Sequence, residues 1–358
     1  MRSFTASIYL CVLLLSLNIL RCRVRTELVE EERLQEYHAR DYSWPLPELL
    51  PNTPGWNRAI RRRLSQVERI PNDNHRYNSW VSVITSAVVS PNFTENGWGL
   101  TRAPVDLVEE LRQSLHNGLK KGPRNEKIIE VIEVDEETRP LFIDQPRLDK
   151  KVLRELQPMH EKWSGVSLKG AIAYGLRVYR NNSVLLMHVD KPNTHIISCI
   201  LHVDHSEDSE PWPIVIEDFQ GNTNEVVLES GDMLFYESSK CIHGRPRAFN
   251  GSWYSSIFVH YYPTDWDRYN RHLESHYAVP KHWHRQLPPQ EGLEDLVMVG
   301  TSMKEPGCKD LWCSLENSVK WRGPAPDGGS VVTTGWDPTT MTPPKVDESP
   351  LDEELAEL

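Results

Sequence analysis

Residues 171–203 read AIAYGLRVYRNNSVLLMHVDKPNTHIISCILHV. Short apolar runs alternate here with turn residues, a pattern typical of antiparallel strands rather than of helices. Many short strands close together favour a sandwich or a double-sheet jelly roll. The same texture continues to residue 262, and we predict strands at 171–179, 184–189, 195–203, 213–217, 225–228, 233–237 and 254–262.

Two amphipathic helices are expected ahead of the strands, at 104–119 and 148–163. Their apolar faces would pack on a common core. Pro158 should kink or interrupt the second helix, because proline removes a backbone donor. The apolar positions at helical spacing are Leu107, Val108, Leu111 and Leu115 in the first helix, and Val152, Leu153 and Leu156 in the second.

A candidate metal site lies on two of the predicted strands. His188 and Asp190 stand two residues apart at the end of an apolar strand, so they face the same side. A third candidate, His243, lies in another short strand at 241–246. Two imidazoles and one carboxylate leave three metal positions open, which Fe(II) needs to bind a bidentate keto acid and then dioxygen. We therefore predict that these three residues bind Fe(II).

We do not predict a metal-binding role for the other histidines of this region. His195 and His202 lie on one predicted strand, but their separation of seven residues places them on opposite faces, so they do not form a joint metal pair. His260 is interpreted as a residue near the end of a strand.

Five blocks carry a resemblance to a known family: YGLRVY at 174–179, HVD at 188–190, ESGDMLFY at 229–236, HGRP at 243–246 and IFVHY at 257–261. Together they resemble the prolyl 4-hydroxylase branch of the 2-oxoglutarate/Fe(II) oxygenases, over roughly residues 165–263. The resemblance implies a cupin-like jelly roll, or double-stranded β-helix, with supporting helices. It also implies Fe(II), 2-oxoglutarate as co-substrate, ascorbate as reductant, and peptidyl proline as the leading substrate.

The resemblance also points to residues around the co-substrate. Tyr179 matches a family tyrosine near 2-oxoglutarate, although a buried core tyrosine is an equal alternative, and His202 stands where relatives hold a polar co-substrate contact. The family places a cation about ten residues after its second histidine to bind the distal carboxylate, but residues 251–253 read Gly-Ser-Trp. Arg245 or Arg177 could replace it, because a buried carboxylate needs a charged partner.

The N-terminus predicts entry into the secretory pathway. An apolar run at 8–20 followed by the basic segment 21–25 fits a signal peptide, or an uncleaved anchor that would hold the protein at a membrane. Cys308 and Cys313 could form a short disulfide in an oxidising compartment. We therefore expect the endoplasmic reticulum lumen or secretion. Glycan acceptor sequons in a lumenal chain would be Asn92, Asn181 and Asn250.

The acidic composition and the remaining segments limit the functions that we consider. A formal net charge of −11 argues against a nucleic-acid partner and leaves a peptide or protein substrate as the expected one. The alternatives are an oxygenase acting on a non-proline substrate, a non-catalytic lumenal jelly-roll protein with a degenerate co-substrate site, and a cupin-like enzyme holding another metal. The predicted segments are a leader at 1–25, an irregular extension at 26–103, an oxygenase domain at 104–265 (helices 104–164, jelly roll 165–265), a second irregular extension at 266–323 and a disordered acidic tail at 324–358.

Overall fold

The computed structural model describes residues 80, 90–127, 131–133, 136–266, 302 and 308–322. The predicted leader, most of the first extension and the acidic tail lie outside these residues. Within the described ranges, no helix is long and apolar enough to cross a membrane.

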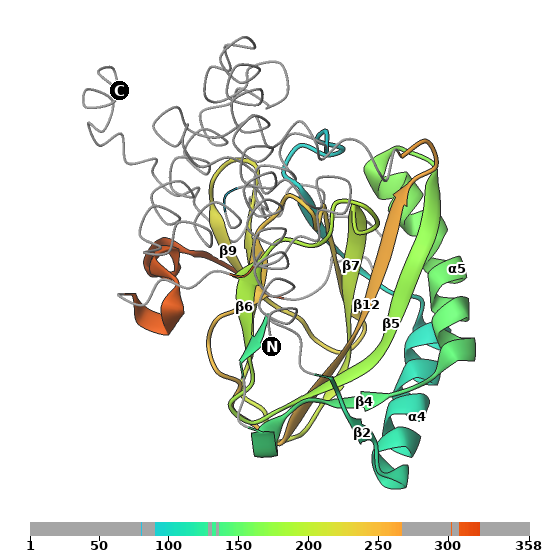
Figure 1. Cartoon of the computed structure of the whole chain (residues 1–358), viewed down its shortest axis with the longest axis vertical. Helices are drawn as coiled ribbons and strands as arrows, with labels where there is room; N and C mark the ends of the chain where they lie inside the picture. Colours follow the sequence, from blue (N-terminus) through green and yellow to red (C-terminus); the bar gives the residue numbers. More distant parts are fainter. Residues whose placement is uncertain are drawn as a thin grey trace, which may run out of the picture.

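Two β-sheets face each other, and the two α-helices cover the outer side of the larger one (Figure 1). The seven-stranded sheet has the order β1-β10-β7-β12-β5-β4-β2, and the six-stranded sheet has the order β13-β9-β8-β11-β6-β3. Described neighbours are antiparallel except β13 and β9, which are parallel. This is the mainly β, jelly-roll architecture with supporting helices that the sequence predicts.

The larger sheet comprises β1 (Trp98–Arg102), β10 (Asp232–Tyr236), β7 (Ile197–His205), β12 (Trp253–Pro263), β5 (Leu168–Arg180), β4 (Leu141–Ile143) and β2 (Arg124–Asn125). The smaller comprises β13 (Val319–Arg322), β9 (Thr223–Val227), β8 (Ile214–Glu217), β11 (His243–Arg245), β6 (Val184–His188) and β3 (Ile132–Glu133). The helices are α4 (Val105–Lys121) and α5 (Pro146–Ser164), with short 3-10 turns η1 (Glu136–Thr138), η4 (Lys309–Leu311) and η5 (Cys313–Asn317).

Side-chain alternation along β12 separates two apolar cores. Ile257 and Val259 pack with the helices on the outer side of the larger sheet. Tyr254 and Phe258 belong to the core between the sheets. Because side chains alternate along a strand, this pattern identifies the residues of β12 that face the smaller sheet.

All seven strands and both helices expected from the sequence are present, with shifts of a few residues at their ends. Pro158 does not interrupt α5, which is continuous from Pro146 to Ser164. The buried face of α5 on the larger sheet offsets the hydrogen bond that proline removes. That face consists of Val152, Leu156, His160 and Trp163.

The sheets extend beyond the predicted oxygenase domain at both ends. β1 lies before residue 104 and pairs along its whole length with β10. β13, which we placed in the C-terminal extension, adds a strand beside β9. Its Trp321 is buried, donates a hydrogen bond to Asn224 over 2.9 Å and packs edge-on against Trp98. Both flanking segments therefore contribute strands to the two sheets.

Candidate metal centre

The structure brings the three predicted ligands together at the ends of two neighbouring inner strands of the six-stranded sheet. His188 ends β6, His243 begins β11, and the two residues are directly paired across these strands. Asp190 follows β6, with its carboxylate oxygens 3.5 Å from Nε2 of His188 and 3.8 Å from Nε2 of His243. A metal at about 2.1 Å from each atom would hold such pairs roughly 3 to 4 Å apart. The three side chains therefore fit around one ion.

Backbone hydrogen bonds fix the free nitrogen of each ligand histidine. Nδ1 of His188 lies 2.7 Å from the carbonyl oxygen of Leu186, and Nδ1 of His243 lies 2.9 Å from that of Cys241. A carbonyl can only accept, so both Nδ1 atoms carry the hydrogen. In the neutral rings both Nε2 atoms keep a lone pair, and it is these atoms that face Asp190.

The charge state of the cluster also suits a divalent cation. Burial lowers the pKa of His243 to about 4, so its ring is neutral at neutral pH. Burial opposes ionisation of Asp190, but the neighbouring His243 and His188 outweigh it and hold the pKa of this carboxyl well below its usual range. Oδ2 of Asp190 is buried without a hydrogen-bond partner in the described chain, which fits a carboxylate oxygen reserved for a cation.

Gly244 allows β11 to approach β6 closely enough to form the site. A Cβ atom at this position would lie 2.7 Å from the carbonyl oxygen of Leu186 and 2.8 Å from that of Leu185. The Leu186 carbonyl is also the acceptor that orients His188. Any larger residue at 244 would therefore displace the group that aims one metal ligand.

Arg245 is a buried cation without a carboxylate partner among the residues that the structure describes. Its guanidinium lies between the rings of Trp212 and Tyr254, 4.6 Å and 4.7 Å from their centroids. It donates to the Trp212 carbonyl and, over 3.1 Å, to the Tyr254 hydroxyl. Both aromatic residues belong to the core between the sheets, so Arg245 faces inward despite the register shift after His243.

Arg177 is buried too, but its charge is already paired. Its Nε and Nη2 atoms donate to the Glu126 carboxylate over 2.7 Å and 2.8 Å. Tyr174 donates to the same carboxylate over 2.7 Å. No pattern in the sequence around Glu126 predicts that it pairs with Arg177. Of the two candidate arginines, Arg245 is therefore the one with an unneutralised charge.

The segment where the family resemblance expects a cation has another role here. Trp253 packs with the helix-side core, whereas the next residue, Tyr254, points between the sheets. Tyr254 pairs across the sheet with Tyr179, and its hydroxyl contacts Arg245. A tyrosine on β12 and an arginine on β11 therefore meet at this end of the interior.

Tyr179 and His202 are both buried close to that arginine. Tyr179 accepts a hydrogen bond from Arg177 over 3.1 Å. The His202 ring stacks on Tyr254 with centroids 4.0 Å apart, and its two nitrogens bond the Ser255 carbonyl at 2.9 Å and Nδ1 of His205 at 2.8 Å. The direct co-substrate contacts of both residues stay predictions, whereas the support of Tyr254 by His202 is observed.

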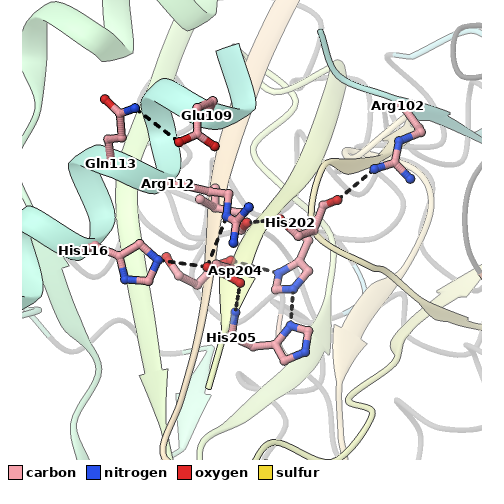
Figure 2. Close-up of polar contacts among 11 residues, drawn as sticks. Arg102, Glu109, Arg112, Gln113, His116, His202, Asp204 and His205 are labelled. Carbon is pink, nitrogen blue, oxygen red and sulfur yellow. Dashed lines mark hydrogen bonds and ion pairs between the residues drawn. The ribbon is translucent and has the colours of Figure 1, made fainter. Parts of the chain in front are cut away.

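A polar network connects His202 with the helix surface (Figure 2). His205 bonds His202 and donates its backbone N–H to Asp204 over 3.0 Å. Figure 2 shows Arg112 and His116 of α4 reaching the Asp204 carboxylate, over 3.3 Å and 3.0 Å. This network anchors α4 to β7 on the outer side of the larger sheet.

Sequence reasoning missed His260, which lies beside the metal ligands. Its Nδ1 is 3.8 Å from Oδ2 of Asp190 and 2.8 Å from the hydroxyl of Ser198. Its ring packs against His195 at a centroid distance of 3.9 Å. Burial lowers the pKa of His260 well below its usual range, and His195 adds to this effect. No local sequence pattern predicts that His260 lies beside Asp190, because this contact depends on how the two sheets face each other.

The remaining predicted sites lie on the surface or in the C-terminal segment. Cys308 and Cys313 form a disulfide. The side chains of the three sequon residues are exposed, as a glycan acceptor requires: Asn92, Asn181 and Asn250.

Comparisons with known proteins give structural likenesses only. No family model matches the chain, and no curated protein is similar to it in sequence. A prolyl-4-hydroxylase from Pseudomonas putida matches 50% of this chain and 99% of its own at 16% identity and a TM-score of 0.37. HygX from Streptomyces hygroscopicus, solved with nickel, 2-oxoglutarate and hygromycin B, matches 49% of this chain and 86% of its own, at 13% identity and a TM-score of 0.36. A Trichoplax adhaerens prolyl hydroxylase, solved with a hypoxia inducible factor peptide, matches 52% of this chain and 90% of its own, at 12% identity and a TM-score of 0.35. At such low values these likenesses carry no argument about function.

Proposed function

We propose that this protein is an Fe(II)- and 2-oxoglutarate-dependent oxygenase. The observation that carries the proposal is the cluster of His188, Asp190 and His243, in which two imidazole nitrogens and one carboxylate converge from adjacent strands. Such a set covers one face of an Fe(II) ion and leaves positions for a bidentate keto acid and dioxygen. Bound there, iron would supply the oxidising chemistry that converts 2-oxoglutarate, O2 and a C–H substrate into succinate, CO2 and an alcohol.

Arg245 supports 2-oxoglutarate as the co-substrate. It stands two residues after His243 and keeps N–H groups beyond those used by Trp212 and Tyr254, since a guanidinium has five. We propose that these groups bind the distal carboxylate of 2-oxoglutarate, with the Tyr254 hydroxyl beside them. Arg177 cannot supply this charge without leaving Glu126 buried and unpaired.

The finer proposal is a prolyl 4-hydroxylase-like enzyme of the secretory pathway that acts on a peptide, with ascorbate keeping the iron reduced. It is supported by the sequence resemblance, by the apolar leader, and by the exposed sequons and the disulfide. Binding of the protein to a membrane depends on whether the leader remains as an anchor.

An anaerobic binding titration tests the oxygenase proposal. Purified full-length protein should bind one Fe(II) per chain, and 2-oxoglutarate should bind much more tightly to the iron-loaded protein than to the apoprotein, because the keto acid is then chelated by the metal. Isothermal titration calorimetry measures both affinities. Equal 2-oxoglutarate affinity with and without iron would contradict the proposal.

A further inference from the structure

The side chains around Asp190 are slightly more exposed than those around Arg245. The Asp190 side chain is 16% exposed and that of His260 is 8% exposed. Taken over the whole residue, His260 is 6% exposed, whereas Arg245 is 2% and Tyr254 3% exposed. Tyr254 and His260 lie on the same strand, six residues or about 20 Å apart. His260 therefore lies at the slightly more exposed end of this strand, beside Asp190.

A chain of hydrogen bonds fixes the proton on His260. The Ser238 hydroxyl donates to the His195 carbonyl over 2.8 Å, because a carbonyl can only accept. Ser238 has then used its one hydrogen, so at 2.7 Å it accepts from the Ser198 hydroxyl. Ser198 in turn accepts from Nδ1 of His260 at 2.8 Å. The hydrogen of a neutral His260 therefore resides on Nδ1, and its Nε2 holds a lone pair.

That lone pair has no partner in the described protein. No described residue donates a hydrogen bond to Nε2 of His260. This atom is also not fully buried, since the fully buried polar atoms without a partner do not include it. The metal cluster does not include it either, since the mutually close ligand atoms are those of His188, Asp190 and His243. A hydrogen-bond acceptor of fixed orientation thus lies next to Asp190, one of the three predicted metal ligands.

We propose that Nε2 of His260 accepts a hydrogen bond from an O–H or N–H group of the prime substrate and so positions it beside the metal. This inference rests on the proposed oxygenase function, and it narrows the substrate to one that carries a donor close to the oxidised C–H bond. In a peptide substrate that donor would be a backbone or side-chain N–H, since proline itself has none. Ser198 is the positioning residue that fixes the ring.

The first test reads the proton position directly. In full-length protein labelled with 15N-histidine, metal-free and then loaded with zinc and 2-oxoglutarate, the His260 Nε2 resonance should have the pyridine-type shift of an unprotonated nitrogen, and Nδ1 the pyrrole-type shift. The signal is assigned by its loss in His260→Gln. Ser198→Ala should average the two shifts, because Nδ1–H loses its acceptor. A pyrrole-type Nε2 in the wild type would overturn the proposal.

The second test asks whether a donor reaches Nε2. Ethylene glycol and 1,2-dimethoxyethane share the O–C–C–O unit, but only the diol can donate a hydrogen bond, because the ether oxygens carry methyl groups. Titrated into the zinc-loaded protein, ethylene glycol should move the Nε2 resonance upfield, and 1,2-dimethoxyethane should not. An equal response, or none to either compound, would overturn the inference. Because no turnover is needed, such a failure is distinct from failure of the oxygenase proposal, which the iron and 2-oxoglutarate titration reports.

Discussion

Arg245 and Arg177 differ in whether a carboxylate lies beside them, and this difference decides which arginine is free to bind an anion. Both are buried, yet only Arg177 faces a carboxylate, that of Glu126. Arg245 is held by two aromatic faces, a carbonyl and a hydroxyl, none of which neutralises it. A buried unpaired cation is costly, so it indicates an anionic ligand.

Arg245→Gln should weaken 2-oxoglutarate binding to the iron-loaded protein by about tenfold or more, because a lost hydrogen bond to a charged group costs about 1.5–3 kcal/mol. Calorimetry under argon measures the affinity, and iron content should stay at one per chain. Arg247→Gln is the matched control: it removes the same charge nearby, from a side chain that pairs with Glu225 and Asp310 instead. Weakening by Arg177→Gln, with Arg245→Gln unaffected, would reverse the assignment.

At this scale the sequence was sufficient to predict that His188, Asp190 and His243 lie close together, but not to predict their surroundings. His188 and Asp190 follow from strand periodicity, and His243 from a second strand motif. The pairing of Arg177 with Glu126 joins residues 51 positions apart, and His260 reaches Asp190 across the interior. Such contacts depend on sheet packing, which no local pattern encodes.

At the scale of elements, the junction of β11 with β6 positions the site. Two strands approach so closely at Gly244 that a Cβ would collide with backbone oxygens of β6. One of those oxygens belongs to Leu186 and orients His188. Backbone contact, rather than side-chain packing, therefore sets the distance between the two histidines.

Gly244→Ala should lower both the stability of the protein and its metal affinity, the latter by about tenfold or more, as expected when the group that orients a ligand is displaced. Metal affinity is measured by competition with a chelator on folded protein. Gly231→Ala is the control, because Gly231 has φ 89° in a turn next to Arg102, away from the ligands. It should reduce stability alone, and the same metal affinity in both variants would refute the role of Gly244.

In helix α5, the buried side chain of His160 makes the stability of the protein depend on pH. Burial lowers the pKa of His160 to about 3, and its Nδ1 donates to the Leu156 carbonyl over 2.7 Å. The unfolded chain binds a proton at about pH 6.5, whereas the folded ring does not. Stability is therefore full above that pH and falls as the pH drops toward about 3, by up to ~1.4 kcal/mol per pH unit for this group.

The His160→Phe substitution should remove the part of the stability loss at low pH that comes from protonation of His160. Urea unfolding of the metal-free protein between about pH 7 and about pH 4 gives the free energy of unfolding, and the difference between wild type and His160→Phe should shift in favour of the variant as the pH falls. The other buried histidines contribute equally to both proteins, so they cancel. Parallel pH profiles would show that His160 is protonated in the folded state.

The elements also show where sequence patterns reach their limit. The seven predicted strands have alternating or continuous apolar runs, and all are present. β1 and β13 lie in segments that are rich in tryptophan and turn residues, and they become strands by pairing with β10 and β9. Pro158 is predicted to kink or interrupt the second helix; it does not interrupt α5, because burial of the helix face outweighs the lost hydrogen bond.

At the scale of the whole molecule, the segments before and after the jelly roll contact it through hydrogen bonds and an ion pair. Glu237, just after β10, accepts hydrogen bonds from the backbone N–H groups of Phe93 and Thr94. At the other end, Asp310 lies within the disulfide-closed loop and pairs with Arg247 over 2.8 Å. Contacts of this kind join distant parts of the chain, and composition alone assigned both segments to irregular extensions.

The secretory proposal predicts glycosylation of the folded surface. Expressed in eukaryotic cells, the protein should migrate faster after endoglycosidase treatment, because its sequon asparagines are exposed. Replacing all three by glutamine should abolish the shift, whereas replacing Asn182, which follows one acceptor but is not itself one, should leave it. An unshifted wild-type band in a cytosolic fraction would contradict this location.

The central claim is that the His188, Asp190 and His243 cluster supports oxidative decarboxylation of 2-oxoglutarate. It is tested most directly by measuring succinate formed from 2-oxoglutarate by the full-length protein in air, with Fe(II) and ascorbate, beside the Asp190→Asn variant. The account predicts slow succinate formation by the wild type that requires iron and oxygen and disappears in the variant, which keeps the shape of the ligand but loses its charge. Succinate formation that survives in Asp190→Asn, or is absent from iron-loaded wild-type protein, would contradict it.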